Sequence, residues 1–344
     1  MSKNGLPRKP LTKRRLKNLI LNVLKNPFNM VVLVSLIILF CLIIIPLLTM
    51  ISSTFTLAQG ELRRVQGHVG DFTLYYWKYI LTGKLASAVL WGPLKNSFIC
   101  GFFTVLVSVP LGSVLAWLMI RTDIPGKKIL GLLVTVPYMI PSWTKALAWL
   151  AMFRNSTSGA NGFLAGMGIP VPDWLAYGPI AIVLCMSMHY YAFSYIMVSG
   201  ALRSINSELE EMGEIQGASK AQILRHITLP LILPSVLSAT VMTISKSIGT
   251  YGVPANLGNR IGYYTLATKM RTFIDQGPQA VGYAMSIVLV LLAALIIFSN
   301  QRIVGVRKSY ATVSGKGGRA TLMPLGKAKK PLMAFLMVFL FLAM

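Results

Sequence analysis

The feature that most constrains this chain is a series of apolar runs, each about as long as a bilayer is thick. The first extends from Met30 to about Met50 without a charged residue, and roughly twenty apolar residues in a helix cross the hydrocarbon core. Within lipid every backbone amide must be paired inside the segment, so such runs form helices. Only 12% of the residues are charged, about half the share found in soluble domains. We therefore expect an all-α, multi-pass protein of a cell membrane, in contact with the lipid bilayer.

The apolar runs divide the chain into spans and polar connections. We expect a first span at 30–51, an external loop at 52–95 and a membrane core at 96–301. Five spans are expected in this core, at about 96–120, 129–153, 179–201, 231–249 and 280–300. Pro137 and Pro141 interrupt the run at 129–153, because proline lacks the amide donor that a helix needs.

Three of the polar connections have a distinctive composition. The segments 154–178 and 251–277 are rich in glycine and are expected to be extramembrane loops. Aromatic residues concentrate at 72–79, which predicts a short helix at the membrane surface, where Trp and Tyr are enriched.

Basic residues are distributed unevenly over the segments outside the spans. About two thirds of the 33 Lys and Arg fall in four of them: 1–29, 121–128, 203–225 and 302–330. Cytoplasmic segments carry an excess of Lys and Arg, so we expect these four, and the N-terminus, to be cytoplasmic. The net charge of +24 would indicate nucleic acid in a soluble protein. Here membrane topology accounts for the charge, and we expect no nucleic-acid partner.

A short apolar segment, 331–344, follows the basic linker at 302–330. Its beginning, Lys330-Pro331-Leu332-Met333, is similar to Lys25-Asn26-Pro27-Phe28 before the first span. Fourteen residues are too few to cross a bilayer as a helix. We interpret the segment as the start of a second, similar half; the alternative is a re-entrant or interfacial C-terminus.

The most polar helical segment, Ser207–Pro230, lies between two spans and holds four of the nine acidic residues. Ser207 and Glu210 form the S-x-x-E pattern of a capping box. Gly217 predicts a left-handed turn at which one helix ends and another begins. A charged helix pair of this length is too short for a catalytic domain and is typical of a docking element. The alternative is a solvated hairpin without a partner.

This hairpin carries a recognisable signature, E-A-A-x3-G-x9-I-x-L-P. Glu211, Gly217, Ile227, Leu229 and Pro230 match it in type and spacing, whereas Met212 and Gly213 replace the two alanines. The segment resembles the cytoplasmic loop of permease subunits of binding-protein-dependent ABC importers, and the likeness covers about residues 90–300. The resemblance implies a six-span, type I importer core with cytoplasmic coupling helices. It also implies an ATPase-coupling loop that includes Glu211, Gly217, Ala218, Ile227, Leu229 and Pro230.

The same resemblance implies several partners. These are a cytoplasmic ATP-binding subunit, an extracellular or periplasmic substrate-binding protein, and a second permease half, fused or as a dimer. The chain has no G-x-x-x-x-G-K-[S/T] phosphate-binding loop of its own. We therefore expect no enzymatic activity in this chain, with ATP hydrolysis in a partner subunit.

Two lysines, Lys145 and Lys246, fall inside predicted spans. A charge at bilayer depth costs at least a few kcal/mol unless it faces a cavity, pairs or reaches the interface. Lys246, Tyr251 and Lys145 are therefore candidates for a substrate pathway, with snorkelling or a structural pair as the alternative for each lysine. Basic residues in a pathway would suit an anionic or anion-chelated substrate.

The segment Gly249–Gly258 resembles the iron(III)-type branch of these permeases, which implies ferric iron as the substrate. Permeases for polyamines, thiamine and aminoalkylphosphonates share parts of this segment, so these substrates remain alternatives.

No metal site or cofactor is expected. The three cysteines lie in apolar runs without ligand spacing, which predicts small buried hydrophobes, and the three histidines are scattered: Cys41, Cys100, Cys185, His68, His189 and His226. A membrane-embedded enzyme is disfavoured because no span carries paired acids, a histidine cluster or a nucleophile–base set. A passive channel would not need the acidic hairpin.

Overall fold

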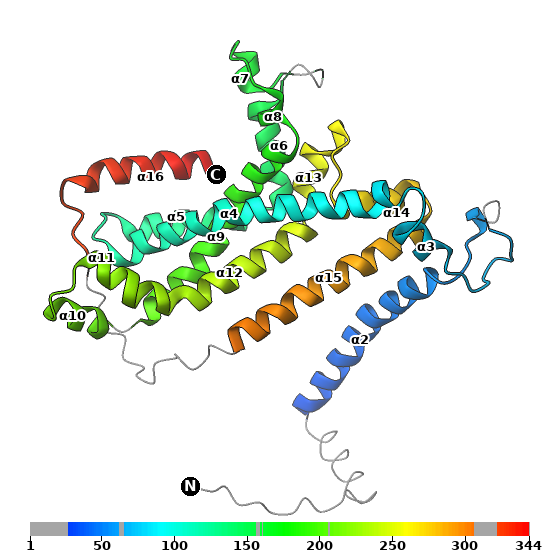
Figure 1. The fold of residues 1–344 in the computed structure, drawn as a ribbon, viewed down its shortest axis with the longest axis horizontal. Helices are drawn as coiled ribbons and strands as arrows, with labels where there is room; N and C mark the ends of the chain where they lie inside the picture. The colour runs from blue at the N-terminus through cyan, green and yellow to red at the C-terminus, as the bar shows by residue number, and fades with distance from the viewer. Residues whose placement is uncertain are drawn as a thin grey trace, which may run out of the picture. The chain divides into compact units, whose positions relative to one another are not determined.

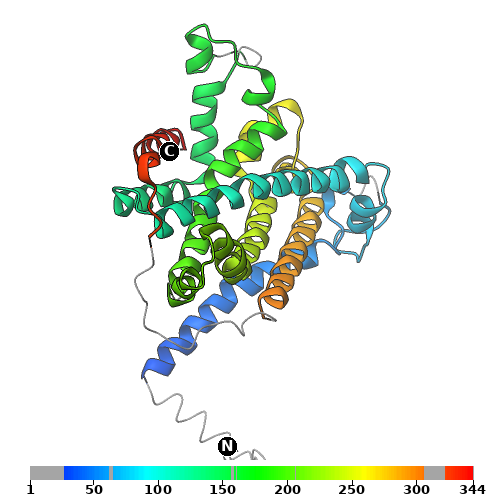
Figure 2. The ribbon, with the colours of Figure 1, turned by 60° about the vertical axis from the view of Figure 1, so that its left-hand side comes forward.

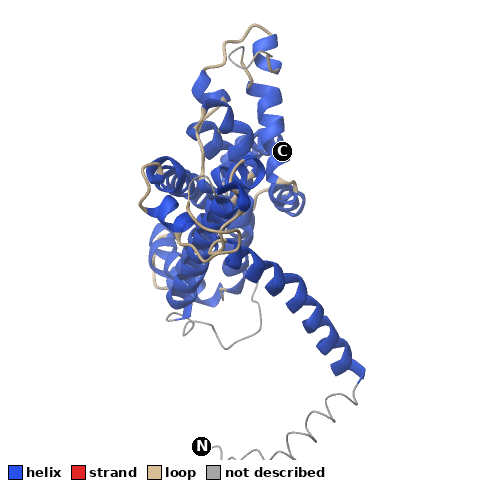
Figure 3. Cartoon of the chain, turned by 90° about the vertical axis from the view of Figure 1, so that its right-hand side faces the viewer, coloured by secondary structure: helices blue, strands red, loops and turns tan. Residues whose placement is uncertain are grey.

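The structure, a computed structural model, describes residues 27–61, 65–155, 159, 161–205, 207–305 and 322–343. Within these ranges the regular structure is helical, apart from two isolated β-bridges (Figure 3). Most of the predicted N-terminal arm and most of the basic linker lie outside the described residues. The chain forms two compact units, Met1–Leu74 and Tyr75–Met344.

The first unit is dominated by helix α2 (Pro27–Ser53; Figure 1). Its 27 residues are apolar on all sides, and none is buried within the described part of the chain. A helix that is apolar all round suits a lipid environment. Cys41 lies on this helix and is exposed, so the prediction of a buried residue is wrong for Cys41, although Cys100 and Cys185 are buried.

The second unit is built on the pair α4 (Gly92–Arg121) and α9 (Pro179–Ser204). Gly112 permits their close approach: a Cβ at this position would lie 2.4 Å from the carbonyl oxygen of Tyr191. Small residues at such contacts let membrane helices pack backbone to backbone.

Two more long helices complete this core. Helix α12 (Leu229–Gly249) packs against both members of the α4–α9 pair, and α15 (Gln279–Gly305) packs against α12. Including α2, five described helices are long and apolar enough to cross a membrane.

The apolar run at 129–153 forms two helices, α5 (Lys127–Met139) and α6 (Ser142–Phe153), instead of one interrupted span. The break falls at Pro141, which has no N–H to bond the carbonyl oxygen of Pro137 one turn earlier. The Nδ1 atom of His189 lies 3.2 Å from that oxygen and satisfies it. Pro137 itself remains inside α5.

The expectation of a loop at 251–277 is wrong. This segment forms α13 (Gly252–Leu257) and α14 (Leu266–Gln276), and Leu257 and Leu266 are fully buried. Gly252 allows close helix packing and does not form a turn, since a Cβ there would lie 2.6 Å from the Cβ of Trp143 on α6.

The segment at 154–178 also contains two short helices, α7 (Phe163–Gly166) and α8 (Asp173–Ala176). The aromatic stretch expected at the membrane surface corresponds to α3 (Tyr75–Leu81).

The last helix, α16 (Lys329–Ala343), packs beside α5 in both ribbon views (Figures 1 and 2). Leu336 and Leu340 are buried in a cluster contributed mainly by α4, α5 and α9. The ring of Phe339 meets that of Tyr191 edge-on, with centroids 5.4 Å apart. The apolar tail is therefore a packed helix of the second unit; that it begins a second half stays a prediction.

Candidate functional site

The polar hairpin consists of α10 (Ser207–Ile215), a glycine turn and α11 (Lys220–Ile223). Gly217 has φ +83°, the left-handed conformation that the sequence predicts for it. The N–H of Ala218 donates to the carbonyl oxygen of Gly213 at 3.0 Å, a bond typical of a glycine-terminated helix. A π-helical turn, Leu224–Thr228, then continues the chain into α12.

The two arms of the hairpin meet at Gly213. A Cβ at this position would lie 3.2 Å from Cδ1 of Ile227 and 3.3 Å from Cγ1 of Ile223, which is closer than most real Cβ contacts. Gly213 stands where the signature has its second alanine. Its missing methyl group brings α10 close to the two isoleucines that follow the turn.

The capping interactions differ from the expected ones. The structure shows a reciprocal capping box at the start of α11, where Ser219 and Gln222 bond each other's backbone N–H groups. The Glu210 carboxylate, expected to cap α10 with Ser207, makes contacts outside α10, and the side chain of Ser207 lies outside the described residues. Glu210 therefore has a tertiary role.

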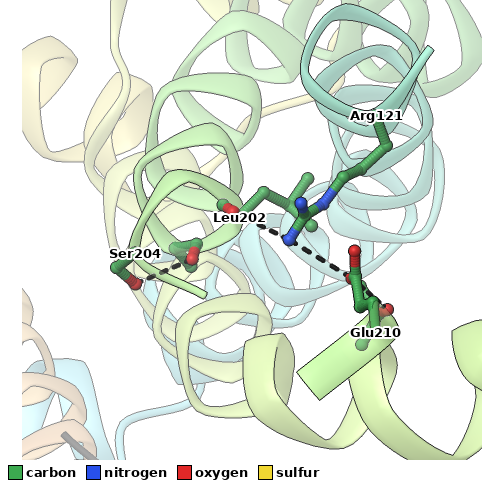
Figure 4. Close-up of polar contacts among 6 residues, drawn as sticks. Arg121, Leu202, Ser204 and Glu210 are labelled. Atoms are coloured by element: carbon green, nitrogen blue, oxygen red, sulfur yellow. Dashed lines mark hydrogen bonds and ion pairs between the residues drawn. The ribbon is translucent and has the colours of Figure 1, made fainter. Parts of the chain in front are cut away.

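Glu210 joins the hairpin to the ends of three long helices (Figure 4). Its Oε1 lies 3.2 Å from Nη2 of Arg121, the last residue of α4. The same Nη2 donates to the carbonyl oxygen of Leu202 in α9 at 3.2 Å. The hydroxyl of Thr228, just before α12, donates to Oε1 at 2.8 Å.

This contact between Arg121 and Glu210 is buried, with 4% of the arginine and 7% of the glutamate exposed. Removing one partner of a buried ion pair leaves an uncompensated charge and costs about 3–5 kcal/mol. The hairpin is thus fastened to α4 and to the start of α12 by one carboxylate, and Arg121 links α9 to the same contact. Sequence reasoning missed Arg121 because nothing in the local pattern links it to a glutamate so far along the chain.

The segment before α16 binds at the same end of the second unit. Thr122 and Met323 form a parallel β-bridge, in which the N–H of Met323 donates to the Arg121 carbonyl oxygen at 2.8 Å. The Asp123 carboxylate accepts a hydrogen bond from the Leu325 N–H at 2.9 Å and forms an ion pair with Nζ of Lys329 at 2.5 Å. The hydrogen bond from Lys329 lowers the pKa of Asp123 below its usual value, with a further contribution from the Leu325 amide.

The outer surface of α10 combines apolar and acidic side chains. Leu209, Met212 and Ile215 are exposed, Ile215 by 85%, and they recur every three residues along one side of the helix. Glu211 is exposed beside them. Exposed apolar surface rimmed by polar residues marks an interaction site.

The remaining signature residues lie along the turn and the start of α12. Ala218 and Ile227 are partly buried, whereas Gly217, Leu229 and Pro230 are exposed. The predicted coupling residues thus extend from α10 through the turn to the start of α12, at the end of the second unit that also carries Arg121.

A second polar site lies near the opposite end of α12. A cavity of about 510 Å³ opens at the break between α5 and α6. Lys246 lines it, with its Nζ 5.2 Å from the ring centroid of Phe193 and 5.9 Å from that of Tyr138. His189 also lines the cavity, although no sequence pattern predicts a function for it.

The other two pathway candidates, Lys145 and Tyr251, do not line this cavity. Lys145 is buried and donates from Nζ to the carbonyl oxygens of Met188, at 2.9 Å, and Ala343, at 3.3 Å. These bonds fit the structural alternative for Lys145. Tyr251 is 47% exposed and precedes α13, and neither residue is among those that line the cavity. In the described ranges, no three His, Cys, Asp or Glu side chains converge on a point that suits a metal ion.

The fold and the hairpin define a transport permease of the membrane. The chain belongs to the family described as "Binding-protein-dependent transport system inner membrane component", which matches residues 108–309. The members of this family are transport permeases, not enzymes, so the predicted class is confirmed at that level.

Two similar proteins carry different substrate names. The sulfate transport system permease protein CysT of Salmonella typhimurium is 25% identical over 227 residues, covering 65% of this chain and 78% of that protein. The putative 2-aminoethylphosphonate transport system permease protein PhnV of the same organism is 28% identical over 232 residues, covering 67% and 80%. Neither name supports the prediction of ferric iron, whereas the aminoalkylphosphonate alternative partly fits.

A solved structure confirms the fold class. A bacterial ABC transporter involved in the import of the acidic polysaccharide alginate has a chain that superposes with a TM-score of 0.62 at 18% identity. The superposition covers 85% of this chain and 99% of that chain.

Proposed function

We propose that this chain is the permease subunit of an ABC importer and takes up energy through the hairpin at 207–230. The observation that carries this proposal is the exposed apolar row on α10, held to three long helices by the buried Arg121–Glu210 contact. A partner that moves α10 therefore moves the ends of α4, α9 and α12 with it. The partner that fits is a cytoplasmic ATP-binding subunit with an apolar groove for a helix.

The arrangement of the basic loops supports a cytoplasmic hairpin. The turn after α4 and the segment before α16 are basic in sequence. The Thr122–Met323 and Arg121–Glu210 contacts bring them and the hairpin to one end of the second unit. The two glycine-rich segments, 154–178 and 251–277, contact each other away from the hairpin. There the N–H of Gly178 donates to the Leu257 carbonyl oxygen at 2.8 Å. That outer end would receive a substrate-binding protein, and a second permease half would complete the pathway.

We further infer that the substrate is a small oxyanion such as sulfate or an aminoalkylphosphonate. Both relatives are named for tetrahedral oxyanions, and Lys246 places a positive charge in the cavity at the α5–α6 break. Competition against radiolabelled sulfate uptake by 2-aminoethylphosphonate, ferric citrate and spermidine tests this choice. Uptake of iron but not of either oxyanion would overturn it.

Association with the ATP-binding subunit tests the coupling role directly. Ile215→Asp places a charge in the apolar row of α10, and Gly217→Asp forces a side chain into the left-handed turn. We expect each variant to lose at least tenfold in ATPase co-purification and uptake. Met167→Asp, a matched change at an exposed residue (63%) in another connection, is the control for ATPase co-purification. Normal ATPase association by both hairpin variants would contradict the proposal.

A further inference from the structure

The cavity at the α5–α6 break has the chemistry of an anion site. Its lining is polar on several sides: Tyr138, Ser142, His189, Tyr190, Ser245, Lys246 and Thr250. No Asp or Glu is among its described lining residues. We propose that this cavity binds a tetrahedral oxyanion through Lys246 on its way across the membrane. This inference rests on the proposed function and locates the substrate site within it.

Lys246 is the centre of the site because its charge is not balanced within the described residues. No carboxylate there lies within 4.0 Å of its Nζ, and its ring contacts to Phe193 and Tyr138 are longer than 5 Å. Cation–π contacts of this length are weak and leave the positive charge of the ammonium group in place. An ionisable side chain in a span that faces a cavity instead of a countercharge marks a substrate or ion pathway.

The surrounding polar groups are held in place by the break in the helix. Pro141 frees the Pro137 carbonyl oxygen, and His189 donates to it from Nδ1 at 3.2 Å, which fixes the imidazole ring at the cavity wall. The hydroxyl oxygens of Tyr190 and Thr250 are 2.6 Å apart, and the Thr250 hydroxyl donates to the carbonyl oxygen of Lys246 at 2.8 Å. The backbone that carries the lysine is thereby fixed.

Two serines supply hydroxyl groups around the charge. Ser142 begins α6 on one side of the break, and Ser245 precedes Lys246 on α12. A tetrahedral oxyanion needs several donors from different directions, and an ammonium with hydroxyls from two helices provides them. A free metal cation would be repelled by the same lysine.

The position of the cavity fits a pathway. Lys246 lies eighteen residues after Thr228, which is roughly 27 Å along α12 at 1.5 Å per residue. The anion site and the coupling hairpin therefore occupy opposite ends of the same helix. Breaks in membrane helices are tolerated where they line a polar cavity, and transporters place substrate sites at such discontinuous helices.

The charge of the cavity can be measured on the full permease chain without transport. The exposed Cys41 is changed to Ser, and Ser142→Cys introduces a reporter thiol in the cavity; the same chain without the reporter gives the background from the buried Cys100 and Cys185. The rates of modification by an anionic and a cationic methanethiosulfonate reagent are then compared. We expect the anionic reagent to react about tenfold faster, relative to its rate with a free thiol, because the positive charge of Lys246 attracts the anionic reagent and repels the cationic one.

Variants assign the preference to the lysine. Lys246→Met and Lys246→Gln should reduce the ratio of the two rates to about one, and Lys246→Arg should retain it. Lys269→Met is the matched control, since it removes a lysine that also lies over an aromatic ring, 4.5 Å from the Tyr264 centroid, but does not line the cavity. An unchanged ratio in both neutral variants would overturn the proposal.

The ligand class is tested with inorganic sulfate as the probe. We expect sodium sulfate to slow modification of the reporter at least threefold, relative to sodium chloride at equal ionic strength, and to lose this effect in Lys246→Gln. Equal rates in the two salts would overturn the oxyanion assignment. Since this assay needs neither ATPase nor uptake, a chain that passes it but does not associate with an ATPase would contradict the proposed function alone.

Discussion

Glu210 shows how one side chain connects the outer surface of the protein to its membrane helices. Its carboxylate contacts Arg121 of α4 and Thr228 before α12, and Arg121 also bonds Leu202 of α9. Because both charged groups are buried, the contact favours one arrangement of the hairpin over alternatives. We interpret it as the joint through which movement of α10 reaches the spans.

At the residue scale, Glu210→Gln should destabilise the chain by roughly 3 kcal/mol, because it leaves the buried Arg121 charge without its partner. The measurement is the free energy of unfolding in detergent. Asp275→Asn is the control, since it breaks an exposed contact with Arg271 that is worth less than 1 kcal/mol. The double variant Arg121→Met with Glu210→Met should lose much less stability than the sum of the losses of its two single variants; a loss equal to that sum would show that the two groups are not coupled.

At the scale of elements, the segment before α16 is attached to the turn after α4 by Asp123. The carboxylate accepts from Lys329 and from the Leu325 amide, and the hydrogen bond from Lys329 lowers its folded-state pKa below the usual value of about 3.9. Because the pKa of Asp123 is lower in the folded state than in the unfolded state, ionised Asp123 stabilises the attachment at pH values above its unfolded-state pKa. This contribution is lost as the pH falls through the lower, folded-state value.

Amide exchange measures this attachment. The protection of Leu325, taken relative to the intrinsic rate at each pH, should stay constant from pH 8 to pH 5 and fall below about pH 4. Asp123→Asn should remove most of the pH dependence, whereas Asp275→Asn, at another paired surface carboxylate, should leave it in place. Protection that does not change down to pH 2 would contradict the assignment.

Helix α16 provides a second prediction at this scale. Leu340 is 2% exposed and Leu342 is 74% exposed on the same helix. Leu340→Ala should cost about 2–3 kcal/mol by leaving a cavity in the cluster with α5, while Leu342→Ala should change stability by less than about 0.5 kcal/mol. Thermal unfolding of the detergent-solubilised chain measures both, and equal effects would show that α16 does not pack in this way.

At the scale of the whole molecule, the distribution of basic residues predicts which loops face the cytoplasm. In a chain with its natural cysteines replaced, Lys128→Cys in the first turn of α5 and Met167→Cys between α7 and α8 place thiols in exposed positions. A membrane-impermeant maleimide should label Met167→Cys in intact cells or spheroplasts and Lys128→Cys only after the membrane is opened. The reverse pattern would invert the topology, and with it the cytoplasmic position of the hairpin.

Sequence reasoning succeeded where the signal is local. Gly217 was expected in the left-handed conformation because one residue between two helical stretches carries that information. It failed at 251–277, because a glycine in the sequence is compatible both with a turn and with close helix packing. Gly252 has the second role, since it allows α13 to contact α6. The substrate prediction failed to gain support for a related reason: a short likeness around Gly249–Gly258 does not report which ligand the pathway accepts.

The membrane class, most of the long helices and the hairpin with its signature could be predicted without a structure, because hydrophobic length, charge asymmetry and turn chemistry act over short stretches of chain. Only the tertiary structure paired Arg121 with Glu210, opened the cavity beside Lys246 and assigned Lys145 to carbonyl oxygens in α9 and α16. These features join side chains that lie far apart in sequence. Their energies depend on burial and distance, which arise only when the helices pack together.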